Sequence, residues 1–156
     1  MGTANHMLRK RGFTLVELMI VLAVIALLVV VSTVGALSMR VQSNEGLAKS
    51  SLKVIASACE AYRAVSTGYP ADLSTLGTTY LSGGLEQGEK SGYTFVLKNG
   101  NSGQTFTCSA VPVAMSYSGV KSYCIDTSNV IYLYENSPNL TADGSACPSG
   151  GTALSN

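Results

Sequence analysis

The sequence has little charge and almost none of the residues that common catalytic sites use. Its 156 residues include no tryptophan, a single histidine and a charged share of 12%, against a typical share of about 25%. The histidine, His6, precedes the long apolar segment, so no imidazole follows that segment to act as a general base. The net charge is only +1, and the 10 basic residues are scattered apart from Arg9, Lys10 and Arg11, which indicates no surface for nucleic acid. We therefore expect no enzyme, and nucleic acid is not an expected partner.

Helix breakers are missing from the first part of the chain. Residues 13–67 contain no proline and only two glycines, Gly35 and Gly46. Proline breaks a helix, whereas an interior glycine costs only about 1 kcal/mol. The sequence therefore predicts one continuous helix over residues 14–66, roughly 80 Å long at about 1.5 Å per residue.

The first half of that helix is an apolar run. Residues 13–37 are almost all apolar, and residues 18–39 contain no charge. About 20 apolar residues cross a bilayer, and basic residues in front of them stay in the cytoplasm. A signal peptide would have a shorter apolar stretch and a small-residue cleavage site, and a buried core helix would need a larger protein around it. We therefore expect a membrane span with its N-terminal end inside and its C-terminal end outside.

Glu17 is the only charged residue in the apolar run. A carboxylate in a membrane segment is costly, so it is a functional hypothesis by default. The alternative is a side chain that reaches back to the nearby membrane surface. Its position alone leaves both interpretations open.

The residues around Glu17 carry a specific pattern. Residues 10–17, with the sequence KRGFTLVE, resemble the leader junction of class III prepilins, the precursors of type IV pilins and pseudopilins. The resemblance implies cleavage after Gly12 by a prepilin peptidase and N-methylation of the new N-terminal residue, Phe13. It also implies that Glu17 and Thr14 set the register of assembled subunits.

Electrostatics agrees with that role for Glu17. Cleavage creates an α-amine on Phe13, and in a bundle of staggered parallel helices this ammonium can lie beside the Glu17 carboxylate of a neighbour. Opposite charges attract strongly in hydrocarbon, and an unpaired charge there is heavily penalised. The pair is therefore expected to fix the axial position of each subunit. Val34 departs from the resemblance, because family members commonly carry proline at that position.

The chain is expected to have four parts. In chain order they are a cleaved leader, a membrane or filament-core helix, an amphipathic helix and a globular head: residues 1–12, 13–37, 38–67 and 68–156. The leader can start at Met1 or at Met7, because residues 1–6 carry no recognisable signal.

The amphipathic helix carries an apolar stripe at helical spacing. Its members recur three, four or seven positions apart: Val41, Ala48, Leu52, Ile55, Cys59 and Tyr62. Val54, Ala58 and Val65 are expected to widen the stripe. A stripe of this kind needs a covering layer, so we expect a sheet to pack against it.

The head shows a helix stop, one helical turn and four strand patterns. Residues 68–70, with the sequence GYP, end the long helix, and residues 71–77 fit one helical turn. The strands are expected at residues 93–97, 104–111, 122–125 and 130–134. Asn99-Gly100 predicts a tight turn between the first two strands, with a longer loop through Gly103 as the alternative. The expected fold class is α+β: the long helix packed on a roughly four-stranded antiparallel sheet, in a type IV pilin-like roll.

Four cysteines in an exported chain predict two disulfides. Alternation along the strands turns Cys108 toward the helix stripe that carries Cys59. It turns Cys124 outward, toward a tail that carries Cys147. We therefore favour Cys59–Cys108 with Cys124–Cys147, and the second bridge would resemble the C-terminal disulfide loop of pilins. A one-residue bulge would instead give Cys108–Cys124 with Cys59–Cys147, and free buried thiols are the third alternative.

Ligand sites are not indicated by the sequence. No CxxC pair is present, so we expect no metal held by cysteine. Asp126 and Asp143 are candidates for calcium, as in some major pseudopilins, but no oxygen-rich loop surrounds them. We interpret both as turn residues and expect no cofactor.

The resemblance implies a structural subunit of a type IV pilus. Such a subunit is held in the bacterial inner membrane and then polymerised into an extracellular helical homopolymer. Its implied partners are copies of itself, the prepilin peptidase and N-methyltransferase, and an assembly platform with its ATPase. Three alternatives are open: a pseudopilin of a type II secretion or DNA-uptake machine, a minor or tip pilin with a binding role, and a membrane-anchored ectodomain that never assembles.

Overall fold

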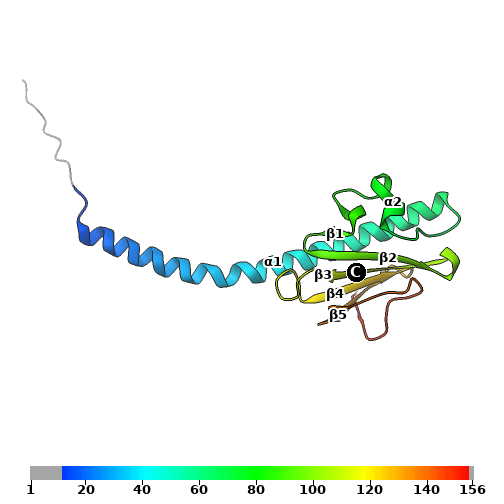
Figure 1. The fold of residues 1–156 in the computed structure, drawn as a ribbon. Helices are drawn as coiled ribbons and strands as arrows, with labels where there is room; N and C mark the ends of the chain where they lie inside the picture. The colour runs from blue at the N-terminus through cyan, green and yellow to red at the C-terminus, as the bar shows by residue number, and fades with distance from the viewer. Residues whose placement is uncertain (1–11, 155–156) are drawn as a thin grey trace, which may run out of the picture. The chain divides into compact units, whose positions relative to one another are not determined.

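The computed structural model describes the backbone of residues 12–154, without the side chains of residues 31–34 and 36 (Figure 1). The leader predictions on residues 1–11 lie outside the described residues. The chain divides into two compact units, of which the first ends at Ala36 and the second begins at Leu37.

Helix α1 spans Leu15–Val65 as one element of 51 residues, which confirms the predicted continuous helix. Its N-terminal part belongs to the first unit, where every side chain from Gly12 to Val30 is exposed. Almost all of these side chains are apolar. The described part of the first unit therefore presents an uncovered apolar surface.

Contacts made by the residues after α1 determine where the helix ends. The hydroxyl of Tyr69 donates a hydrogen bond to Glu60 at 2.7 Å and accepts one from Arg63 at 2.9 Å. The Tyr69 amide donates to the carbonyl of Gly103 at 2.8 Å. A Cβ atom on Gly68 would lie 2.8 Å from that same oxygen. The predicted helix stop needs glycine because another loop passes so close to it.

The second unit contains one antiparallel sheet of six strands in chain order. Its strands are β1 (Glu89–Lys90), β2 (Tyr93–Gly100), β3 (Thr105–Pro112), β4 (Lys121–Asp126), β5 (Ile131–Glu135) and β6 (Thr152–Leu154). The four predicted strands correspond to β2, β3, β4 and β5, and the α+β class is confirmed. The sequence does not predict β1 or β6, because two or three residues are too few to show the alternation of a strand.

The connection between β2 and β3 is the longer of the two predicted loops. The tight turn at Asn99-Gly100 is wrong, because β2 continues through Gly100, which pairs with Thr105. The chain reverses in a short 3-10 helix, η2 (Asn101–Gly103), where Asn101 and Ser102 have φ angles of 47° and 56°.

Two further helical elements, α2 (Leu73–Tyr80) and the 3-10 helix η1 (Leu85–Gln87), precede the sheet. The helical turn predicted for residues 71–77 begins two residues later, at Leu73, and α2 continues to Tyr80 across a kink at Gly77, whose φ is 53°. Asp72 caps α2, since its carboxylate accepts hydrogen bonds from the Thr75 amide and the Ser74 hydroxyl. These hydrogen bonds, led by the one from Ser74, lower the pKa of Asp72.

One face of the sheet packs against the second half of α1. Their shared core includes Ala48, Leu52, Ile55, Ala58 and Cys59 from the helix, with Phe95, Leu97, Phe106, Cys108, Tyr123 and Ile125 from the sheet. The covering sheet is thus confirmed, and so is the stripe from Ala48 to Tyr62, whereas Val41 is only half-buried. Val54 and Val65 do not widen the stripe, because they are 51% and 76% exposed. At 3.6 residues per turn Val54 points about 200° away from Leu52, so the sheet covers Leu52 and leaves Val54 outside.

The tail after β5 covers the other face of the sheet. A smaller core forms there from Cys124, Tyr134 and Ala142, with Tyr132, Leu140 and Cys147 packed against it. The Gly144 amide donates a hydrogen bond to the Thr107 hydroxyl at 2.9 Å, and its carbonyl accepts one from Thr105 at 2.9 Å. Gly144 has a φ of +96°, and a Cβ atom there would collide with the carbonyl oxygen of Asn99. Glycine is therefore required where the tail crosses the sheet.

Candidate processing and assembly site

The predicted cleavage junction lies in non-helical chain directly in front of α1. Residues 12–14 adopt no regular secondary structure, and α1 begins at Leu15. Phe13 is 79% exposed, and no described atom lies within 4 Å of the place that a Cβ on Gly12 would take. The peptide bond between Gly12 and Phe13 is therefore open to the cleft of a protease.

Thr14 and Glu17 form a capping box at the first turn of α1. The Glu17 amide donates a hydrogen bond to the Thr14 hydroxyl oxygen at 3.2 Å. In return, the Glu17 carboxylate lies 3.5 Å from both the amide nitrogen and the hydroxyl of Thr14, at the long end of the hydrogen-bond range. Such reciprocal pairs satisfy groups that a helix start otherwise leaves free. The carboxylate also lies at the positive end of the helix dipole, which stabilises its charge.

The capping box gives Glu17 a role within its own subunit. The sequence contains the signal for it, because Thr-x-x-Glu directly before an apolar run is the capping-box pattern. Our prediction for Thr14 and Glu17 concerns contacts between subunits and omits their contact with each other. The structure brings the two residues together immediately after the exposed Gly12–Phe13 junction.

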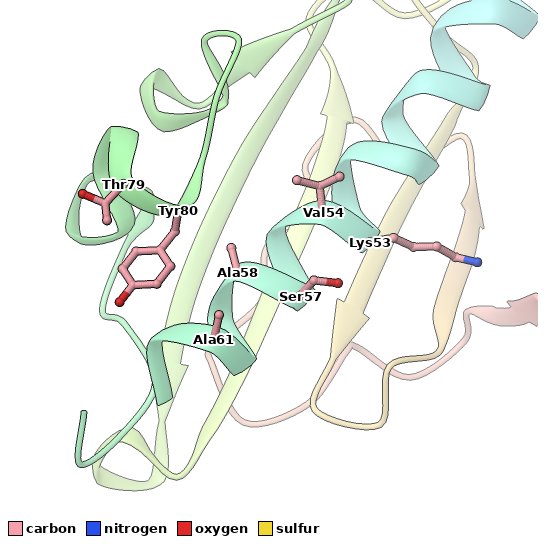
Figure 2. A pocket seen from close by; sticks show the side chains of 7 residues that line it. All are labelled: Lys53, Val54, Ser57, Ala58, Ala61, Thr79 and Tyr80. Atoms are coloured by element: carbon pink, nitrogen blue, oxygen red, sulfur yellow. The ribbon is translucent and has the colours of Figure 1, made fainter. Parts of the chain in front are cut away.

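A shallow groove of about 470 Å³ lies between the second half of α1 and α2. Figure 2 shows the side chains that line it: Lys53, Val54, Ser57, Ala58 and Ala61 from α1, with Thr79 and Tyr80 from α2. Only Lys53 is charged, and its side chain points away from Tyr80. The groove thus offers small and apolar side chains around the exposed Val54.

Comparison with known families identifies the N-terminal region. Residues 7–33 match the family model described as the prokaryotic N-terminal methylation motif. The chain carries this methylation motif. It is the leader motif of class III prepilins, in agreement with the resemblance to type IV pilins and pseudopilins, which are generally non-enzymatic. The motif implies processing by a prepilin peptidase, membrane insertion and then assembly. No curated protein matches the chain.

The predicted membrane span overlaps the methylation motif. Over the described residues, no helix is both long enough and apolar enough to cross a membrane. The expected span at residues 13–37 includes residues 31–34 and 36, whose side chains lie outside that description. The helix itself is present, and the span stays a prediction.

The disulfide Cys124–Cys147 is present, with an S–S distance of 2.02 Å. It connects β4 to the tail, as alternation along the strand predicts. Asp126 adds a second connection, because its Oδ2 atom accepts a hydrogen bond from the Cys147 amide at 3.3 Å. The bulged alternative, Cys108–Cys124 with Cys59–Cys147, is wrong because Cys108 lies in the core under α1 and Cys124 on the opposite face.

Cys59 and Cys108 are free thiols, so the other favoured disulfide is not formed in this structure. Both are fully buried in the core between α1 and β3, as the alternation predicts. Alternation decides which sulfur atoms face each other, but it does not determine their oxidation state. Burial, with a smaller contribution from the Glu60 carboxylate, raises the pKa of Cys59 to about 12. Burial also raises the pKa of Cys108 well above its usual value, with proximity to Cys59 as the second cause.

Asp126 and Asp143 each accept hydrogen bonds from a serine two residues further on. The Asp126 carboxylate accepts from the Ser128 amide, and the Asp143 carboxylate from the Ser145 amide, both at 2.9 Å. The hydrogen bonds from Ser145 lower the pKa of Asp143. Both residues thus stabilise turns, as interpreted from the sequence. Within residues 12–154, no three side chains of histidine, cysteine, aspartate or glutamate gather where they could hold a metal ion.

Cys59 and Cys108 are expected to resist thiol reagents while the chain is folded. The thiolate is the reactive form, and burial with raised pKa values suppresses it at both sites. A colorimetric thiol assay at mildly alkaline pH should count no thiol in the folded chain and two after unfolding without a reductant. The Cys59→Ala, Cys108→Ala double variant is the control and should give none in either state. Zero thiols in the unfolded, unreduced wild-type chain would instead show that the second disulfide forms.

Proposed function

We propose that the chain is a structural subunit of a type IV pilus. A prepilin peptidase cleaves after Gly12, the new amine of Phe13 is methylated, and the subunits polymerise into a helical filament through α1. The observation that carries this proposal is the methylation motif, which includes an exposed, non-helical junction directly before a 51-residue helix. Processing requires the accessible junction, and polymerisation requires the helix that follows it.

The exposed apolar side chains at the start of α1 support polymerisation. In the described part of the first unit, large apolar side chains are between 47% and 79% exposed. Exposed apolar surface of this extent indicates a membrane or a protein partner. Lipid tails and the apolar faces of neighbouring helices cover such a surface about equally well. One helix can therefore hold the subunit in the bacterial inner membrane first and form the core of the filament afterwards.

Glu17 supports an ordered arrangement of these helices. The capping box holds its carboxylate at the start of α1, close in sequence to the amine that cleavage creates on Phe13. A neighbouring subunit that is displaced along the filament axis brings its own Phe13 amine to this carboxylate. The attraction is strong where water is excluded, so one ion pair per contact fixes the displacement.

The groove beside Val54 supports contacts beyond the apolar run. The α1 side of its lining includes the small residues Ser57, Ala58 and Ala61, which suit the close approach of another helix. Leu47 lies seven residues before Val54, so it is on the same side of α1, and it is 45% exposed. In the filament we assign this side of α1 to a contact with a second copy of the chain.

The proposed partners and location follow from the methylation motif. The prepilin peptidase and N-methyltransferase act at the junction of Gly12 and Phe13. The basic residues before the junction keep the N-terminal end inside the cell, and the head stays outside. An assembly platform and its ATPase supply the work of extrusion, because the sequence has no nucleotide-binding motif of its own. The product is an extracellular filament on the cell surface.

A pseudopilin of a type II secretion or DNA-uptake machine is the second candidate function. The methylation motif supports both kinds of subunit. The tail closed by Cys124–Cys147 favours the pilus, because it resembles the C-terminal disulfide loop of pilins. Long fibres and high copy number distinguish a pilus subunit from a pseudopilin, whereas low copy number indicates a minor or tip pilin.

Intact mass and N-terminal sequencing of filaments sheared from cells test the proposal. We expect a chain that begins at N-methylated Phe13 and weighs two hydrogens less than the reduced form, because of one disulfide. Gly12→Val should block processing, since a branched side chain fits an extended cleft less well than glycine. Gly35→Ala is the matched control and should be processed normally. A wild-type chain that keeps its leader and stays in the membrane contradicts the proposal.

Glu17→Gln separates the charge of this residue from its capping role. Glutamine keeps the capping box but carries no charge, so we expect normal processing and loss of filaments. Thr14→Ala keeps the charge and removes the cap, which costs about 1 kcal/mol of helix stability, so we expect fewer filaments rather than none. The measurement is the ratio of sheared to total subunit by immunoblot. Normal filament yield from Glu17→Gln argues against the ion pair.

Val54→Lys tests the groove as a contact between subunits. A charged side chain at this exposed position should leave the fold intact and reduce filament yield, because the filament would bury the charge. Val96→Lys is the matched control, since Val96 is exposed to a similar degree, 44% against 51%, but lies on β2. Circular dichroism should show both variants folded. Equal filament yields from the two variants would assign the contact to another surface.

A further inference from the structure

The four cysteines differ in their access to solvent. Cys59, Cys108 and Cys124 are each 0% exposed, whereas Cys147 is only half-buried in the tail. Thiol–disulfide exchange requires one sulfur to approach another directly, so access decides which cysteine can react with an oxidant outside the chain. Of the four cysteines, all of which lie in the described part of the chain, only Cys147 offers this access.

The sheet keeps the cysteines in two separate pairs. Cys59 and Cys108 lie in the core between α1 and one face of the sheet, whereas Cys124 lies in the smaller core on the other face, with Cys147 packed against it. Figure 1 shows α1 and the tail on opposite sides of the sheet. Burial raises the pKa of Cys59 to about 12 and that of Cys108 well above its usual value, so the reactive thiolate is scarce in the core. An oxidant from outside therefore meets neither thiol of the core pair.

Contacts that use no sulfur atom hold the tail on both sides of Cys147. Three residues before it, Gly144 makes two hydrogen bonds to threonine hydroxyls of β3. One residue after it, the Pro148 carbonyl accepts a hydrogen bond from the Tyr134 hydroxyl, and β6 then pairs with β5. These contacts can place Cys147 beside Cys124 before the bond between their sulfur atoms exists.

We propose that the folded head selects its own disulfide: Cys147 exchanges with an external oxidant, and Cys124 completes the bond. The oxidant is a molecule that carries an exchangeable disulfide, and the fold withholds Cys59 and Cys108 from it. The inference goes beyond the proposed function and relies on it only for the location of the head outside the inner membrane. Disulfides form and persist in that compartment.

The exchange takes two steps. The Cys147 thiolate attacks one sulfur of the oxidant's disulfide, which forms a mixed disulfide and releases the other oxidant sulfur as a thiolate. The Cys124 thiolate then attacks the Cys147 sulfur and releases the second oxidant thiolate. The two cysteines lose two protons and two electrons in total, and the oxidant takes up both and becomes two thiols. The second step is favoured because the docked tail makes it intramolecular.

Two single variants separate the roles of Cys147 and Cys124. Full-length Cys124→Ala and Cys147→Ala chains are purified in detergent, reduced without unfolding and mixed with glutathione disulfide. Mass spectrometry of peptides then locates the bound glutathione over time. We expect Cys124→Ala to stop with glutathione on Cys147. In Cys147→Ala, Cys124 should react at least about tenfold more slowly, because a buried thiol reacts only in transiently opened molecules.

Cys59 and Cys108 report on the fold in the same samples. We expect the reduced wild-type chain to form Cys124–Cys147 and to carry no glutathione on Cys59 or Cys108. In denaturant, every free cysteine of each chain should react. Equal rates in the two variants overturn the inference. Glutathione on Cys59 or Cys108 without denaturant, in any of the three chains, also overturns it, because the head would then not be folded before it is oxidised.

Tyr134→Phe tests the placement of Cys147 by the tail. The variant keeps the buried ring and removes the hydrogen bond to the Pro148 carbonyl. The mixed disulfide on Cys147 should then persist about fivefold longer, because the tail is held less firmly. Tyr132→Phe is the matched control, since Tyr132 is a half-buried tyrosine on the same strand. Equal lifetimes in the two variants overturn placement by this contact. The test needs no filament, so its failure leaves the proposed function standing.

Discussion

An apolar helix surface without cover is the constraint on which the rest of the molecule depends. From Gly12 to Val30 every side chain of α1 and its preceding residues is exposed. Apolar surface in water costs about 25 cal/mol per Å², so a surface of this extent calls for a cover. Lipid and other helices are the two covers that suit it, and the methylation motif implies membrane insertion followed by assembly. The proposed function uses both covers in that order.

The second half of α1 also carries an apolar surface, but the sheet of the same chain covers it. The sheet buries Leu52 and its neighbours on one side of the helix and leaves Val54 exposed on the other. A sheet has two faces, and the tail closes the outer one through Cys124–Cys147 and the hydrogen bond from Cys147 to Asp126. With both faces covered, the sites for contact are the open side of α1 and the loops. This is why the groove carries the proposal about a second copy of the chain.

The sequence predicts the features that repeat at a regular spacing. Residue alternation gives β2 to β5 and the outward direction of Cys124, and the missing prolines give the uninterrupted α1. It does not predict β6, which exists because the disulfide-held tail returns to the edge of β5. Alternation brings Cys59 and Cys108 into one core, but their free state depends on oxidation and not on spacing. The sequence wrongly predicts Val54 in the core, because a broad stripe does not reveal how far a sheet reaches around a helix.

Under the proposed function, Glu17 links the start of the fold to assembly, and that role is compatible with its capping role. Within one subunit its carboxylate faces Thr14 at the positive end of the helix dipole, which lowers the cost of a charge close to lipid. An ionised carboxylate has about four acceptor positions, so the capping contacts leave room for another donor. Under the proposed function, the Phe13 amine of a neighbour can take that place without displacing Thr14. The charge is then tolerated in the membrane and fully paired only in the filament, so the pairing favours assembly over storage.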